Sequence, residues 1–136
     1  MRVLITGCSS GFGRGAAVEL TERGHDVIAT ARRPDAIADL VVAEKLALDV
    51  TSDASVGECF AAAGRVDALV NNAGIGVTGP VERLPIDEGR RAFETNFFGP
   101  LRCIQAVLPQ MRERGSGTIV NVSSLAGRVA PPLDGF

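Results

Sequence analysis

The sequence is poor in three side chains that can act as acid or base, namely tyrosine, histidine and lysine. Its 136 residues contain no tyrosine and no tryptophan, one histidine, His25, and one lysine, Lys45. His25 follows Gly24 in a polar turn, and we assign it no role. Chemistry that needs a phenol as its acid or base is therefore excluded for these 136 residues.

The sequence also lacks an excess of charge of one sign and a paired set of cysteines. The chain has 14 Lys and Arg against 16 Asp and Glu, a net charge of -2, without the basic stripe typical of nucleic-acid binders. Cys8, Cys59 and Cys103 are odd in number and far apart, which fits neither a disulfide framework nor metal-ligand spacing. We expect three reduced thiols, no metal ion and no nucleic-acid partner.

Long apolar runs are absent as well. No run approaches the ~18 residues that a membrane span requires, and the start MRVLITG lacks the pattern of a signal peptide. We therefore expect no membrane partner and a cytoplasmic location. Hydrophobic residues make up 46% and are spread along the chain, which indicates one globular domain over residues 1–136.

What the sequence does contain is a regular alternation of apolar β-branched runs and helical patterns. Strands are predicted over residues 2–6, 27–31, 45–50, 67–73 and 117–123. Helices are predicted over 12–23, with Gly13, Ala16, Ala17 and Leu20 on one face, and over 36–41. This order is typical of βαβ units around a buried parallel sheet.

A longer amphipathic helix is predicted between the last two strands. It ends near Arg114 and Gly115, and Pro100 sits in its first turn, where a missing N–H costs little. Pro109 inside it predicts a kink. Its apolar positions recur at steps of four and three residues, and they are Phe97, Leu101, Ile104, Leu108 and Met111. After the last strand, residues 130–135 are expected to form a loop.

A glycine-rich loop joins the first strand to the first helix. Thr6 to Gly13 reads TGCSSGFG. Gly7 permits a tight turn, Gly11 lets the backbone approach a pyrophosphate, and Gly13 allows close packing of helix on strand. The N–H groups at the start of the helix would face the anion. The alternative is a glycine-rich turn without a ligand, and Cys8 within it is expected to be a small filler.

The spacing T-G-x-x-x-G-x-G resembles that of the short-chain dehydrogenase/reductase family. Three further motifs follow in the family's order: Asp49–Val50–Thr51, the NNAG of residues 71–74, and the pair Ser123–Ser124. The resemblance spans the chain and implies a Rossmann-type doubly wound parallel sheet, strand order 3-2-1-4-5, in three α/β/α layers. TGCSSGFG and the ATARRP segment look most like hydroxysteroid- and retinol-dehydrogenase-like members, which hints at an apolar alcohol or ketone substrate.

The resemblance also implies a cofactor site. Asp49 would hydrogen-bond the adenine amino group, and the NNAG segment would lie beside the adenine ribose. The residues implied to bind the cofactor are Thr6, Gly7, Ser9, Ser10, Gly11, Phe12, Gly13, Arg32, Arg33, Asp49, Val50, Asn72, Ala73 and Gly74.

The choice of cofactor is predicted from charge. Members that prefer NAD place an acidic side chain at the end of the second strand, where this chain has Ala31. Arg32 and Arg33 follow, and a guanidinium suits a 2′-phosphate that a carboxylate would repel. We expect NADP(H) in preference to NAD(H). The alternative for Arg32 is an exposed, solvated charge.

Two residues match the family's catalytic machinery. Ser124 matches the serine that holds the substrate oxygen, and Asn96 matches the asparagine that bends its helix so that a backbone carbonyl holds a water. The alternatives are a hydroxyl that satisfies the backbone at a strand end and an ordinary helix-bending residue. The family's Y-x-x-x-K segment is expected about a dozen residues after Ser124, and the chain ends at Phe136.

Two functions follow from these matches. The first is an oxidoreductase that interconverts an alcohol and a ketone or aldehyde, with a longer intact protein that adds a helix, further strands and most of the substrate pocket. These 136 residues alone would then bind cofactor without turnover. The second is a non-catalytic NADP(H)-binding sensor or scaffold. The resemblance implies a homodimer or homotetramer, paired through the long helix that carries Leu101 and Met111.

Overall fold

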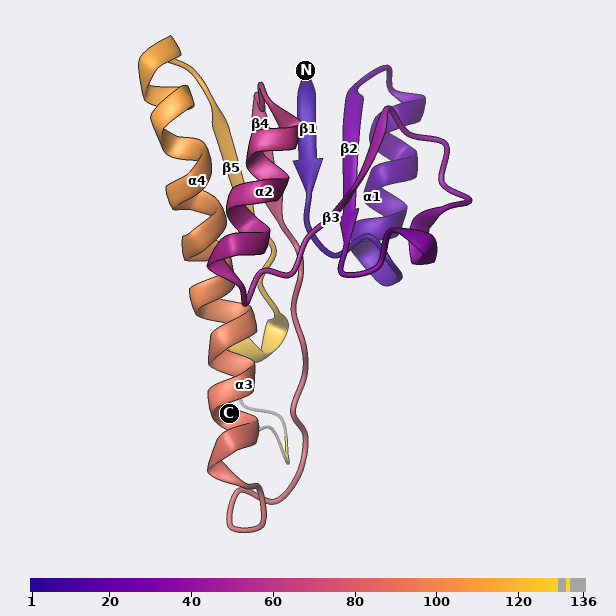
Figure 1. The fold of residues 1–136 in the computed structure, drawn as a ribbon. Helices are drawn as coiled ribbons and strands as arrows, with labels where there is room; N and C mark the ends of the chain where they lie inside the picture. Colours follow the sequence, from indigo (N-terminus) through magenta and orange to yellow (C-terminus); the bar gives the residue numbers. More distant parts are fainter. Residues whose placement is uncertain (130–131, 133–136) are drawn as a thin grey trace.

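A five-stranded parallel sheet forms the centre of the molecule. The computed structural model describes residues 1–129 and 132, so the loop expected at 130–135 lies outside the described residues except for Pro132. The strands run in the order β3-β2-β1-β4-β5, which confirms the predicted α/β class and strand order (Figure 1). Their bounds are β1 (Arg2–Ile5), β2 (Asp26–Ala31), β3 (Glu44–Ala47), β4 (Ala68–Asn71) and β5 (Thr118–Asn121).

The three inner strands are mostly apolar because both faces of the sheet are covered. In β1, Val3, Leu4 and Ile5 are all buried, and β2 is buried from Val27 onward. Four of the predicted strands, all but that of β2, extend too far at their carboxyl ends. There the chain leaves the sheet at residues 6, 48–50, 72–73 and 122–123, and these residues begin the loops that form the site described below.

Helices cover both faces of the sheet. On one face α1 (Gly11–Glu22) packs through Ala16, Ala17 and Leu20 against Val3 and Ile5, as the sequence predicted. On the other face, α2 (Asp53–Ala63) and α4 (Gly99–Arg114) enclose the larger apolar cluster. Figure 1 shows α1 on the opposite side of the sheet from these two helices.

Two helices of the structure were not predicted from the sequence, and a third helix, which was predicted, has different bounds and a different type. These two are α2 and α3 (Ile86–Phe93). The short helix expected at 36–41 is a 3-10 turn, η1 (Pro34–Ile37), because Pro34 can occupy only the first turn of a helix.

The buried face of α4 matches the predicted apolar positions only in part. Met111 is buried and Ile104 packs against the same cluster, but Cys103 and Val107 were not among the predicted positions, and Phe97 is 53% and Leu101 40% exposed. This helix is apolar on more than one side, so periodicity alone does not identify its inner face. α4 continues through Pro109 to a left-handed Gly115, and the kink expected at Pro109 remains a prediction.

The long helical rod positions the site. α3, a π-helical segment η2 (Glu94–Phe98) and α4 follow one another without a break, and the rod extends well past the carboxyl ends of the strands (Figure 1). The segment after β4 runs alongside this rod before turning back into α3. Loops from four strands and one side of the rod therefore meet at the same edge of the sheet.

Candidate functional site

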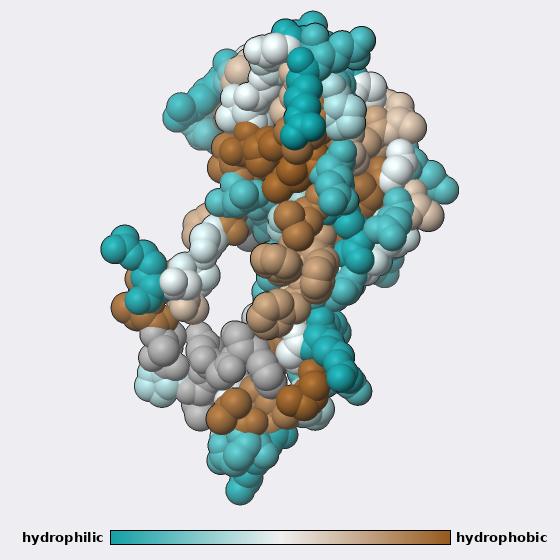
Figure 2. Space-filling model, turned by 90° about the vertical axis from the view of Figure 1, so that its left-hand side faces the viewer, coloured by the Kyte–Doolittle hydropathy of each residue, from teal (hydrophilic) through white to brown (hydrophobic). Residues whose placement is uncertain are grey.

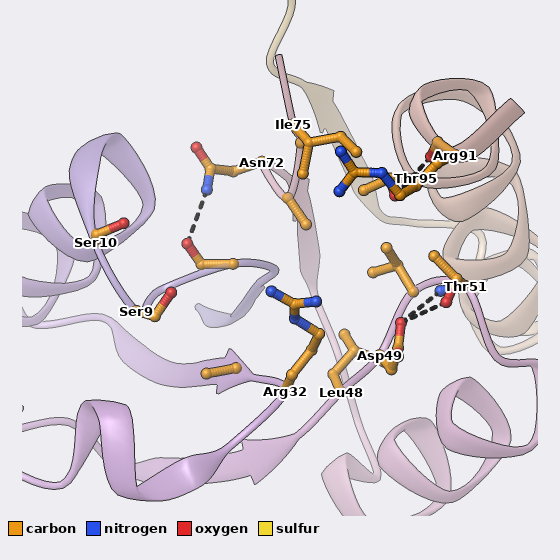
Figure 3. Close-up of a pocket in the computed structure, with 15 residues that line it drawn as sticks. Ser9, Ser10, Arg32, Leu48, Asp49, Thr51, Asn72, Ile75, Arg91 and Thr95 are labelled. Atoms are coloured by element: carbon orange, nitrogen blue, oxygen red, sulfur yellow. Dashed lines mark hydrogen bonds between the residues drawn. The ribbon is translucent and has the colours of Figure 1, made fainter. Parts of the chain in front are cut away.

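A cavity of about 420 Å³ opens at the carboxyl ends of β1, β2, β3 and β4 (Figure 3). This edge of a parallel sheet is where doubly wound proteins bind their ligands. The structure brings together here residues that the sequence predicted from separate motifs, namely Gly7, Ser9, Ser10, Arg32, Asp49, Val50, Asn72, Ala73 and Gly74.

The glycine loop and the NNAG segment are packed tightly against each other. Gly7 has a φ of 74°, and a Cβ on it would lie 2.8 Å from Cα of Ala73. A Cβ on Gly13 would lie 2.5 Å from the carbonyl oxygen of Gly7 and closer still to Nδ2 of Asn72. Both positions therefore require glycine.

Hydrogen bonds hold these two segments in register. Oγ1 of Thr6 accepts from the backbone N–H of Asn72 at 3.0 Å and of Ala73 at 2.9 Å. Nδ2 of Asn72 donates to the carbonyl oxygens of Thr6 at 2.9 Å and of Gly7 at 3.2 Å, the second of which is drawn in Figure 3. Thr6 and Gly13 are buried behind the cavity, so they support it without lining it.

The N-terminus of α1 is suited to an anion. Its N-cap residue, Ser10, makes no side-chain hydrogen bond to the helix, and the first turn contains no acidic residue. By contrast, Oγ of Ser52 caps α2 by accepting from the N–H of Ser55, and Asp53 occupies the first turn of that helix. The N–H groups at the start of α1 thus remain available to a bound phosphate.

The carboxylate of Asp49 is held in a fixed orientation. Its Oδ1 accepts from the N–H of Thr51 at 3.0 Å and from the Thr51 hydroxyl at 2.7 Å. The backbone hydrogen bond from Thr51, followed by its hydroxyl, lowers the pKa of Asp49. Asp49 therefore presents an ionised acceptor at the cavity wall.

The remaining predicted cofactor residues lie around the cavity rather than in its wall. Gly11 has a positive φ of 59° at the start of α1, and the Phe12 side chain is 88% exposed and lines a second cavity instead. Arg33 precedes η1 and does not line the first cavity, whereas Arg32 does.

Several lining residues were missed from the sequence. They are Ala31, Leu48, Thr51, Ile75, Arg91 and Thr95. Thr51 belonged to a recognised motif and could have been included. Arg91 and Thr95 come from α3 and η2. No sequence motif predicted that they line the cavity, and α3 itself was not predicted.

A second cavity of about 800 Å³ adjoins the first. It brings together Asn96 and Ser124, the two residues predicted to be catalytic, with apolar side chains of the rod such as Phe97, Leu101 and Ile104. Oγ of Ser124 accepts from the N–H of Ala126 at 3.2 Å and caps the short turn η3 (Leu125–Gly127). The residues Asn72 to Ile75 border both cavities.

Asn96 lies in the π-helical segment and ties it to the chain after β4. Its Oδ1 accepts from the N–H of Ile75 at 2.9 Å, and its Nδ2 donates to the carbonyl of Ile75 at 2.8 Å. A π-helical turn disrupts the regular ladder of helical hydrogen bonds, and such turns are frequent at functional sites. Asn96 thus lies in a π-helical turn, and the bend that would leave a backbone carbonyl to hold a water remains a prediction.

Residues 1–129 and 132 also bear on metal ligands, membrane spans and thiols. No group of three or more His, Cys, Asp or Glu is placed to hold a metal ion within that range. Within the same range no helix combines the length and apolar character needed to cross a membrane.

The three cysteines are unpaired and buried, and burial raises the pKa of Cys8 to about 11, which fits its role as a loop filler. Lys45 contributes to neither cavity and donates to the carbonyl of Ala38.

The fold and the site define a class, that of doubly wound α/β proteins with a glycine loop of the dinucleotide-binding type. Comparison with known proteins narrows this class. A family described as short chain dehydrogenase matches residues 1–134, and the chain belongs to the short-chain dehydrogenase/reductase family, an oxidoreductase family.

Curated relatives support the assignment. The chain is 41% identical over 138 residues to a 3-ketodihydrosphingosine reductase of Bacteroides thetaiotaomicron, covering 98% of this chain and 51% of that protein. It is 44% identical over 138 residues to human retinol dehydrogenase 8, covering 92% of this chain and 44% of that protein. The chain thus spans about half the length of the curated relatives it matches.

Solved structures agree in fold. A short-chain dehydrogenase from Streptomyces avermitilis superposes with a TM-score of 0.91 at 45% identity, covering 98% of this chain and 53% of that one. A serine dehydrogenase complexed with NADP+ gives a TM-score of 0.90 at 33% identity, covering 98% of this chain and 58% of that one.

Proposed function

We propose that this protein is an NADP(H)-dependent oxidoreductase that interconverts an alcohol and a ketone or aldehyde, with residues 1–136 as its dinucleotide-binding domain. The observation that carries the proposal is the first cavity. Its walls combine the glycine loop, the uncapped start of α1, the oriented Asp49 and the NNAG segment. The NADP+ complex of a related serine dehydrogenase supports the same cofactor class.

In this proposal each wall of the cavity has its own part of the cofactor to hold. Backbone N–H groups of the loop from Ser9 to Gly13 bind the pyrophosphate. Asp49 accepts from the adenine amino group, Asn72 to Gly74 lie against the adenine ribose, and Arg32 pairs with the 2′-phosphate. The cavity's volume and its mixed polar and apolar lining support a nucleotide as the ligand.

The second cavity is the proposed place of reaction. The hydroxyl of Ser124 holds the substrate oxygen, and the backbone carbonyl of Asn96 holds a water. A bound nicotinamide cofactor supplies or accepts the hydride. A purely cofactor-binding sensor has no need of a hydroxyl in the same cavity as Asn96, so the shared cavity favours the enzyme. Because these 136 residues contain no tyrosine, we expect them alone to bind cofactor without turnover.

The proposed substrate class is an apolar alcohol or ketone. Phe97, Leu101 and Ile104 form an apolar wall of the second cavity. The two curated relatives reported above are named for a 3-keto sphingoid compound and for retinol, which supports the same class.

The cofactor proposal predicts that NADPH binds more tightly than NADH. Arg32→Ala should weaken NADPH binding about 10- to 100-fold, because a charge-assisted hydrogen bond contributes about 1.5–3 kcal/mol, and should leave NADH nearly unchanged. Isothermal titration calorimetry of both cofactors with the two proteins measures this. Arg33→Ala is the matched control, since Arg33 does not line the cavity, and its effect should be smaller. Tighter binding of NADH by the unaltered chain would contradict the proposal.

A further inference from the structure

The wall of the first cavity that comes from α3 carries a second arginine. Arg91 and Thr95 line the cavity, one helical turn apart. Nε and Nη2 of Arg91 both donate to Oε2 of Glu88, at 3.1 and 2.5 Å. The Thr95 hydroxyl donates to the carbonyl of Arg91 at 3.1 Å, which joins this turn to the π-helical segment.

The ion pair of Arg91 and Glu88 is placed differently from the adjacent pair on the same helix. Arg90 and Asp87 form a pair of the same spacing at 2.8 Å, but neither residue lines the cavity, and their side chains are 76% and 84% exposed. The side chains of Arg91 and Glu88 are 59% and 40% exposed. Two ion pairs of the same spacing thus lie next to each other on α3, and of their two arginines Arg91 lines the cavity and Arg90 does not.

Glu88 holds Arg91 by one edge of its guanidinium group. Glu88 engages the guanidinium along the edge that carries Nε and Nη2, in the plane of the group. A guanidinium fixed in this way can still stack its face on an aromatic ring. Figure 3 shows the guanidinium groups of Arg91 and Arg32 extending into the cavity from different walls, with Asp49 and Thr51 below Arg91.

We propose that Arg91, anchored by Glu88, stacks on the adenine ring of the bound dinucleotide. The inference rests on the proposed function, in which Asp49 holds the edge of that ring within the same cavity. Arg32 then serves the 2′-phosphate and Arg91 the base, so that the two cations have separate tasks. Arg91 is accordingly a cofactor-binding residue that no sequence motif marks.

The test uses two ligands that differ only in the 2′-phosphate, ADP-ribose and 2′-phospho-ADP-ribose. Calorimetric titration of the chain should show that Arg91→Ala weakens both about two- to fivefold, by the same factor, as expected for a partly exposed cation–ring contact. Glu88→Gln should weaken both by a smaller factor, because the guanidinium loses its anchor. Arg90→Ala is the matched control and should bind both ligands as the unaltered chain does.

Each contrary result has a distinct meaning. A loss confined to 2′-phospho-ADP-ribose would overturn the proposal, because Arg91 would then be a phosphate ligand. Affinities of Arg91→Ala equal to those of the unaltered chain would also overturn it. Failure of the unaltered chain to bind either ligand would instead overturn the proposed function, and this inference with it. Arg91 is exposed, and far-ultraviolet circular dichroism of each variant confirms that it is folded.

Discussion

At the scale of single residues, the site depends on a close approach between the start of α1 and the end of β4. Gly13 is the point of contact, with Gly7 and Asn72 against its Cα. Thr6 is buried directly beneath and satisfies two N–H groups of the NNAG segment. The glycines therefore serve packing as well as ligand binding, because a side chain at either one would separate the two walls of the cavity.

Gly13→Ala should destabilise the protein by about 1–3 kcal/mol, because the new methyl group would overlap backbone that has no room to move. The same change should abolish binding of NADPH. Gly15→Ala is the matched control in the same helix, where a Cβ would meet nothing within 4 Å. That variant should be more stable by about 0.5–1 kcal/mol, since alanine is the better helix former. Urea unfolding followed by circular dichroism measures both, and equal stability of the two variants would refute the packing argument.

The residues that a motif describes were the ones predictable from sequence. Gly7, Asp49 and Asn72 each lie in a short segment whose spacing reflects local geometry, and all three line the first cavity. Arg91 could not be predicted, because it reaches the cavity only through the packing of a helix distant in sequence. For Ser124 the sequence offered a hydroxyl that satisfies the backbone as the alternative, and its bond from the Ala126 N–H is of that kind, although the turn η3 that supplies this N–H was not predicted.

At the scale of elements, two sets of polar contacts attach the rod of α3, η2 and α4 to the loops around the first cavity. Asn96 pairs with both backbone groups of Ile75 in the chain after β4. Arg102 forms ion pairs with Glu94 and with Asp53 at the start of α2, and donates to the carbonyl of Val50 at 3.4 Å. The rod is thus attached to the loop after β3 as well as to the chain after β4, and both of these loops line the first cavity.

Asn96→Ala should cost about 1–3 kcal/mol of stability, because it removes both partners of the Ile75 backbone. The effect is measured as the shift in the urea midpoint. Gln105→Ala, at an exposed position of α4, is the control and should change stability by less than about 0.5 kcal/mol. If Asn96→Ala were as stable as this control, the Asn96 contacts would not be what holds the π-helical segment in place.

The strands were easier to predict than the helices, for a physical reason. A strand buried on both faces is mostly apolar, and that pattern marked β1, β2 and β4, whereas the edge strands β3 and β5 are only partly buried. α3 reads IDEGRRAF, and its charged residues pair with one another instead of forming an apolar stripe. α4 has the opposite difficulty, since Leu101 and Met111 are both apolar while only Met111 is buried.

At the scale of the whole molecule, apolar side chains remain exposed along one side. Figure 2 looks at the side formed by α4 and shows brown and tan residues gathered along it between teal ones. Phe97, Phe98 and Leu101 are exposed on the rod, and Phe97 and Phe98 lie edge to face with ring centroids 5.1 Å apart. Met111 of the same helix packs in the core, and pairing through α4 remains a prediction. We propose self-association through the exposed aromatic and leucine side chains.

Phe98→Glu and Leu101→Glu should each reduce self-association of the chain, because a buried unpaired carboxylate is costly in an interface. Sedimentation velocity over a range of concentrations should show a smaller rise in sedimentation coefficient for both variants. Val41→Glu is the control, since Val41 is 86% exposed and lies on the far edge of the sheet between η1 and β3. An equal rise for all three variants and the unaltered chain would rule out this surface.

The stretch from Asn72 to Ile75 lines both cavities and separates them. One of its sides faces Arg32, Asp49 and Arg91, and the other faces Ser124. Thr6 accepts a hydrogen bond from the N–H of Asn72 at one end of this stretch, and Asn96 accepts one from the N–H of Ile75 at the other, so the stretch is fixed at both ends. We therefore expect a nucleotide bound in the first cavity to fix the position of backbone that also lines the second, so that cofactor binding orders the place where Ser124 lies.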